Sequence, residues 1–254
     1  MNFTIAFFDA KPYDRVAFDE ANRRYGFRII YHESRLNANS VILARGADAV
    51  CLFVHDEADA AIIRQMSGYG GKLRALRAAG YNNVDLNAAR GLLRVVRVPA
   101  YSPYAVAEHT VALMLALNRN PHRAYWRTRD GNFSLHGLMG FDMNGKTAGI
   151  VGTGKIARIV VRILQGFGMK VLAYDIFPDE EYARRSQISY VTLDELYERA
   201  DVISLHVPLT VETRHMIGEA AIARMKEGVV IVNTSRGGLI DTYALIEGLK
   251  SKKI

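Results

Sequence analysis

The sequence contains little cysteine, little proline and no hydrophobic run of membrane-spanning length. Cys51 is the single cysteine among 254 residues, which excludes a disulfide within the chain and is typical of a reducing cytoplasm. It lies in an apolar strand pattern, so we interpret it as a small buried side chain rather than a catalytic thiol. The longest clear apolar run, residues 111–117, is much shorter than the roughly 20 residues of a membrane-spanning helix. Because the N-terminus also lacks the basic lead of a signal peptide, we predict a cytoplasmic protein with no membrane partner.

Basic residues outnumber acidic ones, but no nucleic-acid-binding motif accompanies them. The formal net charge is +7, and 50% of the residues are hydrophobic, enough to bury a core and to exclude a mainly disordered chain. The densest basic patch lies in one candidate helix, residues 119–129, without zinc-ligand spacing or an aromatic–basic pattern. We therefore predict no metal and no nucleic-acid partner, and interpret the charge as a solvated surface or as attraction for anionic small molecules. Nucleic-acid binding is an alternative that the charge alone supports.

Short runs of Val, Ile and Leu alternate with amphipathic stretches, which is typical of parallel α/β sheets. The predicted strands cover residues 3–8, 28–31, 49–53, 73–77, 93–96, 147–151, 170–174, 189–191, 201–205 and 229–232. The predicted helices cover residues 17–25, 58–66, 83–90, 104–117, 156–165, 193–199, 219–225 and 243–249, and another can start at Pro121. The helix 104–117 is apolar on most faces, so we expect it to be buried.

Two closely spaced prolines divide the chain. Pro99 and Pro103 break regular structure and suit a crossover between two domains. We therefore predict one domain of residues 1–99 and a second of residues 100–254.

A glycine motif directly follows the predicted strand 147–151 and directly precedes a predicted helix, which is the context that a dinucleotide-binding turn requires. Gly152 permits the tight turn, Gly154 lets the backbone approach a pyrophosphate, and Ala157 takes the place of the third glycine. The free N–H groups of the helix and its dipole then face the phosphates. Asp175 ends the next strand, where a carboxylate accepts hydrogen bonds from ribose hydroxyls and repels a 2′-phosphate, so we predict NAD(H) over NADP(H). A carboxylate that only caps a loop is the alternative.

Two further segments end predicted strands, where open α/β sheets bind ligands. Residues 231–241 contain Arg236, whose planar donor fork suits a carboxylate or keto oxygen, followed by two glycines that permit close approach. A surface arginine is the alternative interpretation. Residues 76–85 contain Gly80 in a strand-to-helix loop whose backbone N–H groups can hold a small anion, although many such loops look alike.

Together, these segments resemble the D-isomer-specific 2-hydroxyacid dehydrogenase family over essentially the whole chain. The matching segments are residues 77–85, 98–108, 149–157, 204–210 and 233–241. Similarity to the bacterial fermentative D-lactate dehydrogenases is carried by residues 99–103, 117–119, 122–125, 132–135 and 140–141. The resemblance implies a flavodoxin-like substrate domain and a Rossmann-type NAD-binding domain with a parallel sheet that is incomplete at its C-terminus. It also implies a homo-oligomer formed through the NAD-binding domain, and hydride transfer between NADH and pyruvate or another 2-oxo acid.

The resemblance further implies roles for individual residues. Arg236 matches the catalytic arginine, which binds the substrate carboxylate and the 2-oxo oxygen. The substrate would also meet the backbone of Ala79 and Gly80 and the side chain of Tyr101. The implied cofactor-binding residues are Gly152, Thr153, Gly154, Lys155, Ile156, Asp175, Val207, Pro208, Thr234 and Ser235.

The sequence departs from the family at its C-terminal end. Family members continue for several tens of residues, which carry the acid–base histidine, its glutamate partner and the last strands of the cofactor sheet. We expect the 254-residue chain by itself to lack useful turnover, because general acid–base catalysis contributes about 10²–10⁴-fold. Pyruvate reduction measured near the rate of a full-length homologue would contradict this. We also expect the strand 229–232 to be an exposed sheet edge. A non-catalytic, NAD-sensing interaction protein of the same family is the alternative function.

Overall fold

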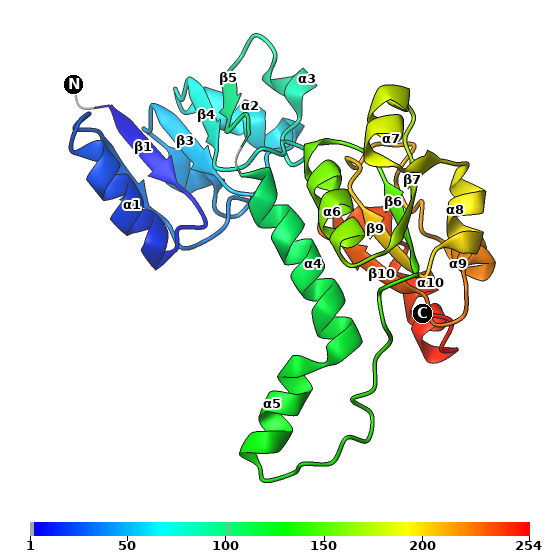
Figure 1. Ribbon diagram of the computed structural model, residues 1–254. Helices are drawn as coiled ribbons and strands as arrows, with labels where there is room; N and C mark the ends of the chain where they lie inside the picture. Colours follow the sequence, from blue (N-terminus) through cyan, green and yellow to red (C-terminus); the bar gives the residue numbers. More distant parts are fainter. Residues whose placement is uncertain (1–2, 101) are drawn as a thin grey trace. The chain divides into compact units, whose positions relative to one another are not determined.

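The computed structural model describes residues 3–100 and 102–254, so the predicted substrate contact of Tyr101 lies outside the described residues. The chain divides into two compact units, the second of which begins at Ser102. Each unit is built on one five-stranded parallel sheet (Figure 1). The predicted α/β fold class is therefore confirmed.

The first unit has the strand order β2-β1-β3-β4-β5, which is the flavodoxin-like order. Its strands are β1 (Thr4–Phe7), β2 (Arg28–Tyr31), β3 (Ala49–Leu52), β4 (Leu73–Leu76) and β5 (Arg94–Arg97). Its helices are α1 (Pro12–Asn22), η1 (Val41–Ala44), α2 (Ala60–Gly68) and α3 (Leu86–Ala89). Helix α1 begins earlier than predicted, because Pro12 at the first helical position supplies a helical φ without losing a hydrogen bond.

The single cysteine belongs to the interior of this unit. Cys51 lies in β3, whose residues are all buried. Burial raises the pKa of its thiol to about 12, so the side chain stays a neutral thiol at physiological pH. The prediction of a small buried side chain is confirmed.

The second unit has the strand order β10-β9-β6-β7-β8, a Rossmann-type order in which the sheet grows first on one side of β6 and then on the other. Its strands are β6 (Thr147–Val151), β7 (Lys170–Tyr174), β8 (Ser189–Tyr190), β9 (Val202–Leu205) and β10 (Val230–Asn233). Its helices are α4 (Pro103–Arg119), α5 (Pro121–Arg129), α6 (Lys155–Gly166), α7 (Glu180–Ser186), α8 (Leu193–Arg199), α9 (Glu219–Arg224), η2 (Gly237–Leu239) and α10 (Thr242–Lys250). β10 is an edge strand, as predicted, and α7 was missed by the sequence reasoning.

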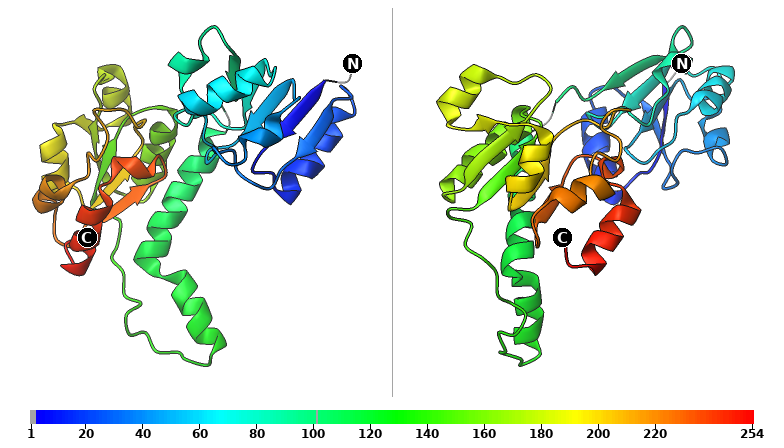
Figure 2. Two further views of the ribbon diagram at one scale, coloured as in Figure 1. Left: turned by 180° about the vertical axis from the view of Figure 1, so that it is seen from behind. Right: turned by 90° about the vertical axis from the view of Figure 1, so that its right-hand side faces the viewer.

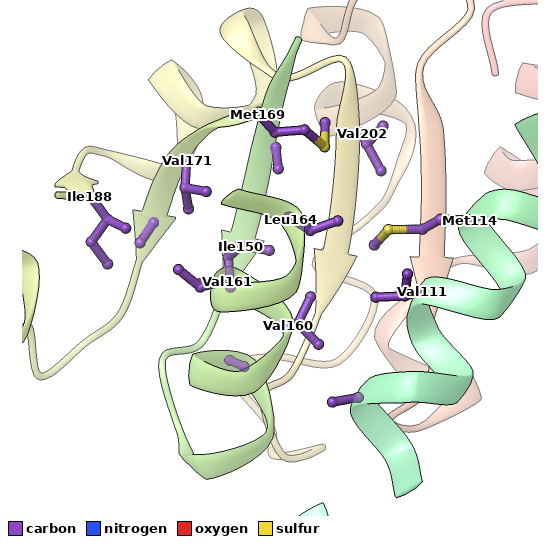
Figure 3. Close-up of a cluster of buried hydrophobic side chains, with 14 of the residues drawn as sticks. Val111, Met114, Ile150, Val160, Val161, Leu164, Met169, Val171, Ile188 and Val202 are labelled. Atoms are coloured by element: carbon purple, nitrogen blue, oxygen red, sulfur yellow. The ribbon is translucent and has the colours of Figure 1, made fainter. Parts of the chain in front are cut away.

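Helices α4 and α6 pack on the second sheet and form one buried cluster with it (Figure 3). Val111 and Met114 come from α4, Val160 and Leu164 from α6, and Ile150 from β6. Because β6 leads directly into the glycine motif, this packing fixes α4 and α6 to the strand that carries the turn.

The opposite face of α4 is exposed, so the prediction of a helix buried on most faces is wrong. Tyr104, Leu113 and Leu117 are all exposed. The buried residues form one stripe, consisting of Ala107, Thr110, Val111, Met114 and Asn118. Hydropathy alone indicates that a helix face is apolar but does not specify which surface covers it.

Residues 118–141, which we call the arm, leave the second sheet and return to it, and they include α5 (Figure 2). At the base of the arm, the Asn118 side chain donates to the Phe141 carbonyl at 2.9 Å and accepts the Phe141 N–H at 2.8 Å. A Cβ on Gly140 would lie 2.1 Å from the Asn118 carbonyl oxygen, so only glycine allows this closure. Beyond this closure, the arm exposes several apolar side chains, which are Tyr125, Trp126, Phe133, Leu135 and Met139.

Candidate functional site

The glycine turn after β6 is as tight as the sequence predicts. Gly152 has a φ of +88°, in the region that favours glycine. A Cβ on this residue would lie 2.8 Å from Val207 Cγ1 and 2.9 Å from the His206 carbonyl oxygen. Its N–H donates to the Tyr174 carbonyl at 2.7 Å, which joins the turn to the end of β7. The turn therefore packs directly against the segment that follows β9.

The N-terminus of α6 opens onto free space. Gly154 is the N-cap residue and supplies no side-chain cap, and a Cβ added to it would meet no atom within 4 Å. Lys155 is exposed and Ile156 is half-buried in the first turn of the helix. A helix start with uncapped backbone N–H groups and no side chain at its entrance fits a phosphate or diphosphate group.

A chain of hydrogen bonds holds Asp175 against the turn. The Thr153 N–H and hydroxyl both donate to Asp175 Oδ2, at 2.7 and 2.8 Å, and the Phe177 N–H donates to Oδ1 at 3.0 Å. The Tyr190 hydroxyl in turn donates to Thr153 Oγ1 at 2.9 Å. The Asp175 carboxylate therefore lies next to the glycine turn and stabilises it.

Asp175 is a carboxylate at neutral pH. Burial by itself would raise its pKa, but hydrogen bonds from Phe177 and Thr153 outweigh burial and lower the pKa below its ordinary value. An ionised carboxylate directly after β7 is a hydrogen-bond acceptor that suits ribose hydroxyls.

Arg158 stabilises the glycine turn by hydrogen bonds, and the sequence analysis did not identify this residue. Its Nε donates to the Thr153 carbonyl at 3.0 Å, and its Nη2 donates to Asp179, the N-cap residue of α7, at 2.8 Å. The guanidinium also lies 4.2 Å from the centre of the Tyr182 ring. No sequence signal links these residues, because they come together only when α6 and α7 pack on the same sheet.

The predicted residues after β9 and β10 are brought together. The Ser235 hydroxyl donates to the Val207 carbonyl at 2.6 Å, which joins the two strand ends. Val207 is also the side chain that Gly152 approaches, so the glycine turn and the Arg236 loop meet through it. Pro208 follows in the same segment and is exposed.

The loop that carries Arg236 is held by its own hydrogen bonds. The Asn233 side chain accepts the Ser235 N–H at 2.9 Å and donates to the Arg236 carbonyl at 2.9 Å. Arg236 is half-buried, and its Nη1 donates to the Ser235 carbonyl at 2.9 Å. The guanidinium is therefore oriented by the backbone of its own loop, and its planar shape suits a planar anion such as a carboxylate.

The predicted anion loop of the first unit follows β4. Ala79 and Gly80 are half-buried, and Arg97 donates to the Ala79 carbonyl at 2.8 Å. Arg77, at the start of the loop, donates to the carbonyls of Phe8 and Asp9 at 2.9 and 3.0 Å. The loop is thus anchored to β5, which is a neighbour of β4 in the sheet, and to the segment that follows β1.

His206 is unsuited to serve as a proton donor at neutral pH. Its Nε2 lies 2.9 Å from the Ser204 hydroxyl, and burial lowers its pKa to about 4. The imidazole is therefore neutral at pH 7 and is best described as a residue that supports the turn through its backbone.

Lowering the pH from about 7 to about 5 is expected to destabilise the protein through His206. The unfolded imidazole takes up a proton near its ordinary pKa of 6.5, whereas the folded one stays neutral down to about pH 4. Unfolding therefore binds a proton in this range, and the free energy of unfolding decreases as the pH falls. Urea unfolding at the two pH values measures the decrease. The variant His206→Gln should show a smaller decrease, and an equal one in both proteins would contradict the assignment.

Across residues 3–100 and 102–254, no group of His, Cys, Asp and Glu side chains could hold a metal ion. None of the helices in those ranges has the length and hydropathy of a membrane span.

Comparison with known proteins identifies similar sequences and structures. Residues 111–254 match the family model described as D-isomer specific 2-hydroxyacid dehydrogenase, NAD binding domain. D-lactate dehydrogenase of Escherichia coli is 51% identical over 251 residues, which are 98% of this chain and 76% of that protein. A 2-hydroxyacid dehydrogenase homolog of Haemophilus influenzae is 52% identical over 254 residues and is also covered to 76%.

Two solved structures are similar along nearly the whole chain. The apo-structure of D-lactate dehydrogenase from Escherichia coli matches with a TM-score of 0.89 and 50% identity, covering 99% of this chain and 79% of that one. D-lactate dehydrogenase from Aquifex aeolicus, complexed with NAD and lactic acid, matches with a TM-score of 0.86 and 34% identity, covering 98% and 74%.

Proposed function

Since this chain belongs to the D-isomer specific 2-hydroxyacid dehydrogenase family, we propose that its cofactor and substrate sites serve the interconversion of pyruvate and D-lactate with NAD(H). The observation that carries the proposal is that the glycine turn and the Arg236 loop meet at Val207, at the carboxyl ends of the strands of the second sheet. This arrangement puts an anion-binding helix start and a guanidinium at the same strand ends. The 51% identity with a D-lactate dehydrogenase supports pyruvate as the 2-oxo acid.

The residues of the turn fit the NAD that the family model implies. In this proposal the backbone from Gly152 to Ile156 holds the diphosphate, and Asp175 accepts hydrogen bonds from the ribose. The open space at Gly154 and the ionised state of Asp175 support these roles. Val207, Pro208, Thr234 and Ser235 line the remaining path. When bound, NADH supplies the hydride for reduction of the substrate.

Arg236 binds and orients the substrate in this proposal. A guanidinium offers two parallel N–H groups to a carboxylate, and its single delocalised positive charge also attracts the 2-oxo oxygen, which polarises the carbon that accepts hydride. The family resemblance implies further substrate contacts from the backbone N–H groups of Ala79 and Gly80 and from Tyr101, which lies outside the described residues. The first unit is thereby assigned as the substrate unit, and the single buried thiol supports a location in a reducing cytoplasm.

An assay of the protein as its gene encodes it tests this function. With pyruvate and NADH we expect oxidation of NADH and, by chiral chromatography, formation of D-lactate. NADPH should be a much poorer cofactor because Asp175 repels a 2′-phosphate. Formation of L-lactate, or NADH binding without reduction of any small 2-oxo acid, would overturn the proposal.

We also propose that two copies of the chain associate through the arm and the exposed face of α4. Exposed apolar patches of this kind mark protein–protein interfaces, and a two-fold dimer is the commonest assembly. The arm and the adjoining part of α4 expose aromatic and long aliphatic side chains, which are Leu113, Leu117, Tyr125, Trp126, Phe133, Leu135 and Met139. The Asn118–Phe141 hydrogen bonds join the two ends of the arm at its base.

The double variant Leu117→Asp/Trp126→Asp is expected to be monomeric where the unmodified chain is dimeric. Two carboxylates placed in an apolar interface would have to be desolvated without a partner. Sedimentation equilibrium measures the mass. Val16→Asp is the matched control, because Val16 is an exposed apolar residue of α1 in the first unit. A monomeric unmodified chain, or a double variant that stays dimeric, would contradict the proposed interface.

A further inference from the structure

We propose that Thr110 of α4 is a positioning residue for the cofactor site, because it holds the Thr234 hydroxyl as a hydrogen-bond acceptor for the carboxamide of the nicotinamide ring. The inference rests on the proposed function, in which Thr234 lines the cofactor path beside Arg236. It goes beyond that function by giving a role to a helix that contributes no residue to the motif or the catalytic loop.

The hydrogen bonds of the two threonines determine the direction of donation. Thr110 Oγ1 lies 2.8 Å from the Val106 carbonyl oxygen and 2.8 Å from Thr234 Oγ1. A hydroxyl has one hydrogen, and a carbonyl can only accept, so the Thr110 hydrogen goes to Val106. Thr234 must then donate to Thr110. Its own hydrogen is used, and its oxygen retains only lone pairs for a ligand.

Burial makes this arrangement rigid. Thr110 has no exposed surface and belongs to the buried stripe of α4, and its neighbour in sequence, Val111, is part of the cluster with α6 and the sheet (Figure 3). A water molecule therefore cannot substitute for the Thr110 oxygen without disturbing the core. Thr234 is half-buried at the end of β10, so its hydroxyl is held on one side and reachable on the other.

The chemistry of the cofactor selects the group that Thr234 accepts from. NAD carries N–H donors on the adenine amino group and the nicotinamide carboxamide, and O–H donors on its riboses. Arg236, two positions after Thr234, binds the substrate in the proposed function, and the substrate must meet the nicotinamide ring. The N–H donor near Thr234 is therefore the carboxamide, and the nucleotide analogue below distinguishes it from a ribose hydroxyl.

Titration of the chain with NADH, followed by nucleotide fluorescence, tests the proposal. Thr110→Val keeps the shape of the side chain but removes the oxygen, and we expect NADH affinity to fall about 5-fold, the effect of one neutral hydrogen bond. Thr110→Ser should restore it. Thr234→Val should lose at least as much, and adding Thr110→Val to it should cause no further loss, because both variants remove the same acceptor.

A cofactor analogue separates positioning from a general structural effect. Reduced 3-acetylpyridine adenine dinucleotide has a methyl group in place of the amide nitrogen, so its affinity should be nearly unchanged by Thr110→Val and Thr234→Val. Thr128→Val is the matched control, because the Thr128 hydroxyl makes the same bond to the carbonyl four residues earlier, at 2.8 Å, on the exposed helix α5. We expect it to bind both nucleotides normally.

Each contrary outcome has a distinct meaning. If Thr110→Val or Thr234→Val weakens NADH and the analogue equally, or weakens neither, the inference is overturned and the proposed function stands. If Thr110→Val does not fold, Thr234→Val decides the matter by the same comparison of the two nucleotides. If the unmodified chain binds no NADH, the proposed function falls and the inference falls with it.

Discussion

Replacing Arg236 by glutamine is expected to weaken binding of a 2-oxo acid by at least about 100-fold. The variant loses a charge-assisted, two-pronged interaction whose hydrogen bonds are each worth roughly 1.5–3 kcal/mol. Because the loop is held by Asn233 and by the Ser235–Val207 bond, the backbone should keep its conformation. The affinity for NADH should therefore change little.

Binding of oxamate, an unreactive analogue of pyruvate, to the NADH complex measures this effect without requiring turnover. Arg236→Lys keeps the charge but loses the planar fork, so its loss should lie between those of the glutamine variant and the unmodified chain. Arg214→Gln is the control, since Arg214 is an exposed arginine in the loop after β9. If Arg236→Gln binds oxamate as tightly as the control does, Arg236 is a surface residue and not the substrate-binding group.

Replacing Gly154 by alanine is expected to abolish high-affinity NADH binding while leaving the fold intact. Replacing Gly152 by alanine should weaken NADH binding and also lower the stability of the fold. The Gly154 Cβ would point into open space, so the variant should lose no more than about 1 kcal/mol of stability at this cap position. The same methyl group would occupy the space through which a diphosphate approaches the N-terminus of α6.

The Gly152 variant differs because the fold itself fills the space beside that residue. A Cβ there would lie 2.9 Å from the His206 carbonyl oxygen, and the φ of +88° disfavours any side chain. Overpacking and backbone strain together cost roughly 2–5 kcal/mol. Thermal unfolding and NADH titration measure the two effects separately.

Gly166→Ala provides the reference for both glycine variants. Gly166 ends α6, has no neighbour within 4 Å of an added Cβ and lies at the far end of the helix from the turn. We expect unchanged NADH affinity and unchanged or slightly higher stability. Normal NADH binding by Gly154→Ala would show that no phosphate approaches this residue, and would contradict the assigned cofactor site.

The structure corrects the prediction for α4, because the sequence does not indicate which part of the protein covers each face of that helix. The apolar residues of α4 predict a helix buried on most faces, yet Tyr104, Leu113 and Leu117 are exposed. Hydropathy reports the preference of each side chain but not the partner that satisfies it. The short helix α7 was missed for a related reason, since its seven residues are mostly charged and bury only Tyr182 and Ala183.

The sequence by itself determined the features that depend on neighbouring residues. Alternating apolar runs specify the order of strands and helices, and a glycine pair between a strand and a helix specifies the φ of Gly152 and the uncapped start of α6. An aspartate at the end of the next strand specifies a carboxylate close to the glycine turn, because the carboxyl ends of parallel strands lie on the same side of a sheet. Each of these is a local backbone property, so the residue types and their spacing are sufficient.

Only the tertiary structure decided which distant side chains meet. Tyr190 reaches Thr153, Ser235 reaches Val207, and Thr110 reaches Thr234, at distances of 2.9, 2.6 and 2.8 Å. Nothing in the spacing of these residues distinguishes them from other hydroxyl-bearing residues on the same elements. Their partners depend on strand register and on how α4 packs, and both are set by the burial of the whole apolar core rather than by any local pattern.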